Sequence, residues 1–256
     1  MYFLQVKTFI LKTAIILLFL HYSYASFAQK TDSTKAIPYV SGAFTVTNNG
    51  ISLIPTFSLG KPAVVFDFAA GRKRLSFEPQ LRFALEDGKP WSFVFWARYK
   101  LVETDKFKLT IGAHPSVVFS NTTGTVNNVT KELLTAKRYW ATEFSPNYAV
   151  AKNVRVGLYY LYGHGISADA SKNTHFIALN GYFSHVRLSD DFFLKFNPQV
   201  FYLKIDAKDG FFVTETVTLA RRNCPFTLSS IGTKTLKTNL VGVKDFVWNV
   251  NLMYAF

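Results

Sequence analysis

The sequence alternates strictly between apolar and polar residues over unusually long runs. In segment 75–86, one face carries only leucine, phenylalanine and proline, while the other is mostly polar or charged. Segments 107–119, 192–202 and 246–256 show the same alternation. Only a β-strand separates two such sets of side chains. Strands in soluble proteins average about 5–6 residues, whereas a tilted strand needs about 9–11 to cross a bilayer. The pattern therefore predicts membrane-spanning strands.

The composition agrees with a β-rich membrane protein and excludes several other classes. Hydrophobic residues make up 49% of the chain, aromatic residues 17% and charged residues 18%, with 26 Phe and 13 Tyr. A disordered chain would have few aromatic residues and more charge. The single cysteine excludes a disulfide scaffold within the chain. The excess of aromatic and β-branched residues also disfavours a helical bundle.

The N-terminal segment 1–28 has the features of a secretory signal peptide. Lys7 and Lys12 precede a short apolar core, and small residues before Ala28 mark a cleavage site. A transmembrane anchor is the alternative, but the uncharged run 13–28 is shorter than the roughly 20 residues that a spanning helix needs. Removing these 28 residues and their two lysines leaves 228 residues with a net charge of about +11. No later run is long and apolar enough for a membrane helix.

Turn-forming residues divide the rest of the chain evenly. We expect longer connections at 120–133, 165–173 and 234–244. The count gives twelve strands within a barrel domain 51–256, with ten or fourteen as alternatives. The segment 29–50 is then a periplasmic N-terminal segment, and its apolar stretch 39–47 either lies outside the barrel or pairs with an unrecognised strand. The sheet must close, because lipid offers no partners for backbone N–H and C=O groups. We therefore expect an all-β, closed antiparallel transmembrane barrel.

The signal peptide, the long amphipathic strands and an aromatic last residue make the chain resemble bacterial outer-membrane β-barrel proteins. In that family the last strand ends in an aromatic residue with apolar residues at alternate positions before it. The matching residues are Phe246, Trp248, Val250, Leu252, Tyr254 and Phe256. The resemblance implies a porin-like protein in the outer membrane of a Gram-negative bacterium, with a last strand that the barrel-assembly machinery recognises. It leaves the function open, since the family includes pores, enzymes, adhesins and assembly factors.

The polar faces of the predicted strands supply the candidate lumen. The lumen-lining candidates are Glu78, Arg82, Glu86, Arg98, Lys100, Lys108, Lys137, Glu143, Arg155 and Lys195. Seven bases against three acids predict a lumen that favours anions. The alternative is a polar wall whose charges neutralise one another. A twelve-stranded barrel is wider than the eight-stranded barrels that side chains fill and narrower than the sixteen-stranded open channels. We expect a narrow pore for small solutes, or a structural or accessory component with a membrane partner protein.

Two other functions remain open. His114 and Ser116 lie two residues apart on one strand face, and some outer-membrane lipid hydrolases use a His/Ser pair. Those enzymes place the pair on the lipid-facing wall, whereas His114 and Ser116 are predicted to face inward, with no acid assigned to the histidine. The other alternative is a secreted soluble β protein. We expect no enzyme activity and no cofactor as the leading hypothesis.

The remaining motifs give weak signals. His164 and His175 flank the connection 165–173, but two histidines without further ligands do not predict a metal site. The lysines and arginines form no basic stripe, so contact with lipid phosphates is favoured over nucleic-acid binding. Cys224 lies in a predicted turn. Glu215 interrupts the apolar face of segment 211–219, and a carboxylate facing mid-bilayer is unfavourable, so either the strand sits higher in the membrane or Glu215 faces a partner.

Overall fold

The computed structural model describes residues 37–126 and 129–256, so the predicted signal peptide at 1–28 lies outside the described residues. Within the described ranges the chain forms twelve strands and one short 3-10 helix. The strands are β1 (Tyr39–Thr47), β2 (Ala63–Arg72), β3 (Leu75–Ala84), β4 (Pro90–Glu103), β5 (Phe107–Val126), β6 (Val129–Ala151), β7 (Val154–Gly165), β8 (Asn173–Arg187), β9 (Phe192–Ile205), β10 (Lys208–Arg221), β11 (Phe226–Thr238) and β12 (Phe246–Ala255). The same ranges contain no helix long and apolar enough to cross a membrane.

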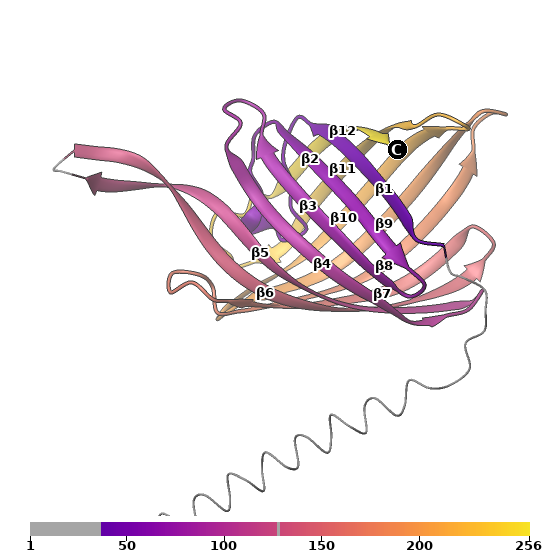
Figure 1. Ribbon diagram of the computed structural model, residues 1–256, viewed down its shortest axis with the longest axis horizontal. Helices are drawn as coiled ribbons and strands as arrows, with labels where there is room; N and C mark the ends of the chain where they lie inside the picture. The colour runs from indigo at the N-terminus through magenta and orange to yellow at the C-terminus, as the bar shows by residue number, and fades with distance from the viewer. Residues whose placement is uncertain (1–36, 127–128) are drawn as a thin grey trace, which may run out of the picture. The chain divides into compact units, whose positions relative to one another are not determined.

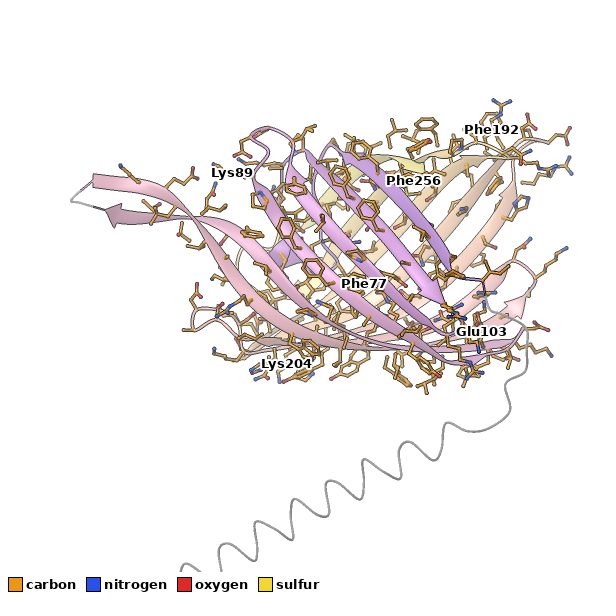
Figure 2. All side chains as sticks on the ribbon, viewed as in Figure 1. Phe77, Lys89, Glu103, Phe192, Lys204 and Phe256 are labelled. Atoms are coloured by element: carbon orange, nitrogen blue, oxygen red, sulfur yellow. The ribbon has the colours of Figure 1, made fainter. Side chains whose placement is uncertain are left out.

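Each strand pairs antiparallel with its neighbours in the sequence, and β1 pairs with β12, which closes the barrel (Figure 1). The predicted fold class and the predicted count of twelve are therefore confirmed. The short turns after β2, β4, β6, β8 and β10 gather at one end, called here the turn end. The connections after the odd-numbered strands gather at the other, called the loop end. Figure 2 places Lys89 and Lys204 at the loop end and Glu103 and Phe192 at the turn end.

Side chains alternate between the lumen and the outer surface, because successive residues of a strand point to opposite faces. On β8, β9 and β10, the inward Phe176, Phe201 and Phe212 are at most 3% exposed. The outward Val200 and Phe211 are half-exposed. Figure 2 shows Phe77 of β3 on the outer surface as well. The apolar faces that the sequence analysis assigned to lipid are thus the outward faces of the wall.

The predicted start of the barrel wall at residue 51 is wrong. The segment 39–47 is a wall strand, paired with β2 along its whole length and with β12 from Ala43↔Ala255 to Thr47↔Asn251. The segment 51–59 is not a strand: it belongs to the connection between β1 and β2, folds back into the barrel and contains the 3-10 helix η1 (Pro55–Phe57). Ile54 is buried by lumen residues and Phe57 packs against the same cluster, whereas Leu53 is 43% exposed. The total stays at twelve because one segment replaces the other.

The predicted connection 120–133 is also mostly strand. β5 and β6 stay paired from Phe107↔Tyr148 to Val126↔Val129, and together they form a ribbon that projects beyond the barrel (Figure 1). Threonine and valine are frequent in this stretch, and both residue types favour strands. The connection after β7 begins and ends close to the predicted 165–173.

Candidate functional site: a lumen narrowed by a folded-in loop

A belt of ion pairs follows the inner wall across β3 to β7. Arg98 Nε donates to Glu143 Oε1 at 2.6 Å, and Nη2 donates to Oε2 at 3.1 Å. Arg98 Nη1 also donates to Glu78. Tyr159 donates its hydroxyl to Glu143 Oε2 at 2.8 Å, and the Arg98 guanidinium lies 4.2 Å from the centre of the Trp96 ring. Charge-assisted, bidentate contacts of this kind are the strongest hydrogen bonds in proteins, so the belt is a rigid part of the wall.

A glycine makes this belt possible. Gly112 of β5 lies between Arg98 of β4 and Glu143 of β6 in the strand register, so the ion pair has to pass over it. A Cβ at Gly112 would lie 2.8 Å from Glu143 Oε1 and 3.1 Å from Arg98 Cγ. Any larger residue would push the carboxylate away from the guanidinium.

A second polar group lies on β2 and β3. Arg82 Nη2 donates to Gln80 Oε1, and Gln80 Nε2 donates in turn to Asp67. The Arg82 guanidinium lies 5.1 Å from the centre of the Trp91 ring. Arg82 forms no ion pair with any acid in the described part of the chain. Asp67 is a lumen acid that the sequence analysis missed, although its place in the alternation of β2 assigns it to the inward face.

The other predicted lumen bases differ in their neighbours. Lys100 and Lys108 face Glu103 near the turn end, with nitrogen–oxygen distances of 2.9 Å and 3.8 Å. Arg155 and Lys195 pair with no acid among the residues that the structure describes. Positive charge on the inner wall is therefore only partly neutralised.

Two further predicted lumen residues, one base and one acid, lie at the loop end. Lys137 pairs with Asp169 of the β7–β8 connection at 3.2 Å. Glu86 is not a lumen residue: it lies in the turn after β3 and faces Lys61 at 3.5 Å, with its side chain 58% exposed. The prediction for Glu86 is wrong because β3 ends at Ala84, which interrupts the alternation.

The connection between β1 and β2 fills much of the lumen near the loop end. Ile54 belongs to an apolar cluster with inward residues of β4, β6 and β7 to β10. Trp91 of β4 donates its indole N–H to the carbonyl of Phe57 at 2.8 Å, and the Phe57 ring lies 5.2 Å from that of Tyr139. This apolar interior could not be predicted from the sequence, because alternation does not distinguish apolar residues that face lipid from those that face a folded-in loop.

The folded-in loop separates two cavities. One holds about 120 Å³ and lies between the loop and strands β3 to β8. The other holds about 260 Å³ and lies between the loop and strands β9 to β12, where Gln199, Thr214 and Thr233 contribute polar groups. The folded-in loop therefore has one of these cavities on each side near the loop end.

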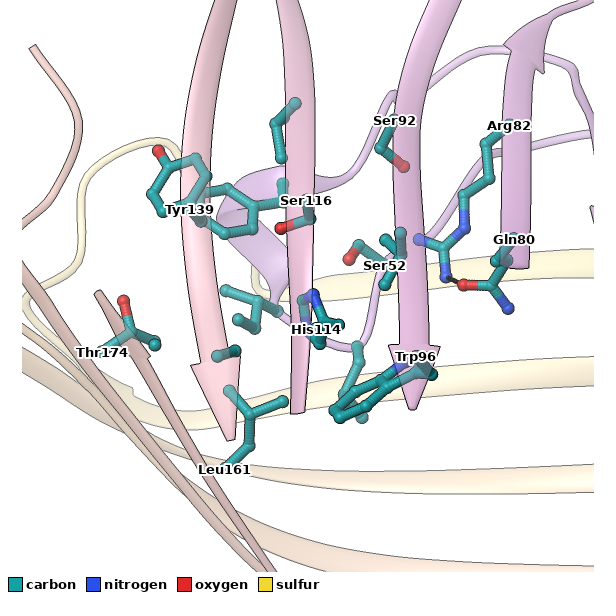
Figure 3. Close-up of a pocket in the computed structure, with 17 residues that line it drawn as sticks. Ser52, Gln80, Arg82, Ser92, Trp96, His114, Ser116, Tyr139, Leu161 and Thr174 are labelled. Atoms are coloured by element: carbon teal, nitrogen blue, oxygen red, sulfur yellow. Dashed lines mark hydrogen bonds between the residues drawn. The ribbon is translucent and has the colours of Figure 1, made fainter. Parts of the chain in front are cut away.

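His114 and Ser116 line the smaller cavity, with Trp96 beside the histidine at a ring-centre distance of 4.1 Å (Figure 3). Both are buried on the inward face. His114 Nδ1 has no hydrogen-bond partner, so no carboxylate orients the ring through this nitrogen. The pair therefore lies inside the barrel and not on the wall that would meet lipid.

The remaining predicted positions lie outside the lumen. His175 is on the outer face and contacts Tyr160 Oη through Nδ1 at 2.9 Å, while His164 pairs in register with Asn173. In residues 37–126 and 129–256 no three His, Cys, Asp or Glu side chains lie together as a metal site would require. Cys224 is a free thiol in the turn after β10.

Glu215 has a local structural role. It lies on the outward face of β10 between Pro198 of β9 and Gly232 of β11. Its Oε1 accepts a hydrogen bond from the backbone N–H of Asn197 at 3.2 Å. Pro198 has no N–H, so the ladder is weakened at this position and the carboxylate supplies an acceptor beside the gap.

Comparison with solved structures identifies the architecture. No protein-family model and no curated protein sequence matches the chain. Among solved structures, a KdgM porin has a TM-score of 0.54 at 10% identity, covering 84% of this chain and 99% of that one. A KdgM porin in complex with disordered oligogalacturonate has a TM-score of 0.52 at 9% identity, covering 86% and 99%. The chain has the fold of an outer-membrane porin.

The likeness to porins is a likeness of fold alone. A NanC porin has a TM-score of 0.47 at 10% identity, covering 85% of this chain and 98% of that one. At such identities the residues that select a solute need not be shared. The likeness therefore establishes the fold only, and what the lumen could bind depends on this chain's own residues.

Proposed function

We propose that the chain is an integral outer-membrane protein that forms a narrow, porin-like channel favouring small anions. In this arrangement the loop end faces the exterior and the turn end faces the periplasm. Outer-membrane barrels have short turns on the periplasmic side and longer loops outside, which supports the orientation. Cleavage near Ala28 and export to the outer membrane stay part of the proposal.

The outer surface supports a membrane position over the alternative of a secreted soluble protein. Leu179 is 63% exposed and Leu252 is 51% exposed, and many other large apolar residues of the wall are exposed with them. A soluble protein rarely exposes so continuous an apolar surface. In a bilayer these side chains are in contact with lipid.

The observation that carries the channel proposal is the partly neutralised basic lumen. Arg155 and Lys195 face the lumen without a carboxylate partner, and such groups attract anions into a pore. The folded-in loop leaves two narrow spaces, which favours small solutes over large ones. The positive charge of the lumen favours anions and the narrow spaces limit the conductance, so we expect an anion-favouring channel of low conductance.

Features of the last strand support the proposal that the barrel-assembly machinery recognises it. Its apolar residues are outward, and Phe256 is 64% exposed. At the seam, Gly42 and Phe256 exchange two backbone hydrogen bonds, each 2.9 Å long. A side chain at Gly42 would collide with the Phe256 ring, so glycine leaves the space that the terminal aromatic residue occupies.

Planar-bilayer recording tests the channel. We expect a small conductance for the mature protein with a reversal potential that indicates anion preference. A variant in which a short Gly/Ser linker replaces residues 51–59 should conduct several times better, because the two narrow spaces merge. The control replaces Asp105 and Lys106, two exposed residues of the turn after β4, by Gly/Ser, which leaves the net charge unchanged. If the parent and the shortened variant both fold and neither conducts, the channel proposal is wrong.

A further inference from the structure

The cavity of about 120 Å³ beside the folded-in loop combines an apolar body with polar atoms that lack partners. Ser92 Oγ and His114 Nδ1 are both buried without a hydrogen-bond partner. Ser92 is 5% exposed and His114 7% exposed. Leaving such groups unpaired costs free energy, so each favours a ligand atom that completes its hydrogen bonding. Two such groups in one cavity indicate a binding site.

The cavity carries one positive charge. Arg82 is the single permanently charged residue among those that line it, and Gln80 takes up only one of its five N–H groups. Arg82 and Ser92 are direct partners in the β3–β4 register, so their inward side chains are neighbours. Figure 3 shows both of them on the same side of the cavity. A guanidinium beside a hydroxyl donor suits a carboxylate, whose two oxygens accept several hydrogen bonds.

Much of the remaining lining is apolar, and Ser52, Ser116 and Thr174 add hydroxyl groups. Trp96, Ile54 and Leu161 contribute large apolar surfaces, and the Trp96 ring packs edge-on against His114. An apolar cavity of about 150 Å³ accommodates a benzene molecule. The present cavity is slightly smaller and is not fully enclosed, so it matches one ring or a short branched chain.

We propose that this cavity binds a small monocarboxylate with an apolar body, of the size of benzoate. The carboxylate pairs with Arg82 and accepts the Ser92 hydroxyl, while the ring lies against Trp96 and Ile54. The site goes beyond the channel proposal, because it requires a defined pocket and not only a positive lumen. It also does not require the barrel to conduct.

Isothermal titration of the mature protein in detergent micelles with benzoate tests the site. We expect one benzoate per barrel. Benzamide, which has the ring without the charge, and acetate, which has the charge without the ring, should each bind at least tenfold more weakly. Equal affinity for benzoate and acetate would mean general attraction by a basic lumen and would overturn the proposal. The proposal would also be overturned if none of the three ligands gave a saturable heat of binding at concentrations up to 10 mM while the barrel is folded.

Variants assign the binding to the named atoms. Arg82→Gln should weaken benzoate about tenfold or more, because it removes a charge-assisted contact, and Ser92→Ala should weaken it severalfold. The matched control is Arg187→Gln, which removes an exposed arginine at the end of β8 and should leave the affinity unchanged. Each variant must keep the faster migration of a compact folded barrel, relative to the heat-denatured chain, on an unheated gel. Unchanged affinity in both folded pocket variants would refute the site, whatever the bilayer recordings give.

Discussion

Replacing Arg98 tests whether the belt of ion pairs stabilises the wall. In Arg98→Gln, Glu143 loses two charge-assisted hydrogen bonds and Glu78 loses one. The Glu143 side chain is only 2% exposed, so its charge stays buried without its main partner. Removing one member of a buried ion pair costs about 3–5 kcal/mol. Because Arg98 and Glu78 are each more than a quarter exposed, water replaces part of the lost contact, and we expect a loss of about 3 kcal/mol.

Urea unfolding of the barrel in lipid vesicles, followed by tryptophan fluorescence, measures this loss. Lys100→Gln is the matched control: it removes an exposed pair with Glu103, and exposed pairs contribute about 0–1 kcal/mol. The double variant Arg98→Gln with Glu143→Gln should recover part of the loss, because the uncompensated charge is gone. If Arg98→Gln lowers the free energy of unfolding no more than Lys100→Gln does, the belt does not stabilise the wall.

Three more substitutions test single positions by the same unfolding measurement. Gly112→Ala should cost about 1–3 kcal/mol by displacing Glu143, whereas Gly163→Ala, where a Cβ meets nothing closer than 3.5 Å, should cost less; equal costs would contradict the packing argument. Ser92→Ala should raise the free energy of unfolding of the ligand-free protein by about 1 kcal/mol, since it removes a buried hydroxyl without a partner, and a loss of stability would count against that description. Glu215→Gln keeps the acceptor for Asn197 and removes a charge from the lipid-facing wall, so stability in vesicles should rise by less than about 2 kcal/mol; a decrease would place the carboxylate beside a positive partner.

The wall was predictable from sequence because lipid and lumen impose alternation on every spanning strand. The face of β3 that holds Phe77, and the face of β12 that holds Leu252, follow from period two alone. The polar belt was partly predictable for the same reason: Arg98 and Glu143 were assigned inward. That Gly112 lies between them depends on the register of three strands, which the sequence of any one strand does not contain.

The folded-in loop shows where alternation fails. Residues 51–59 place Ile51, Leu53 and Phe57 at alternate positions, as a spanning strand would. Alternation indicates that the two faces of a segment have different environments, but it does not indicate whether the apolar face contacts lipid or protein. Here Ile54 lies in the cluster with Phe176 inside the barrel and Phe57 packs against it, whereas Leu53 is 43% exposed. With twelve strands counted from residue 51, an even number leaves 39–47 outside the barrel or paired with an unrecognised strand, whereas it is the first wall strand, between β12 and β2.

The ribbon of β5 and β6 should differ from the barrel wall in the rate of backbone amide hydrogen exchange. β5 pairs with β4 only as far as Val118, yet its pairing with β6 continues to Val126. At about 3.4 Å per residue, these last eight residues extend roughly 27 Å past the wall. Their backbone amides are held by one neighbouring strand instead of two and are surrounded by water. Deuterium should therefore enter the ribbon well before it enters the wall strands to which the ribbon is joined.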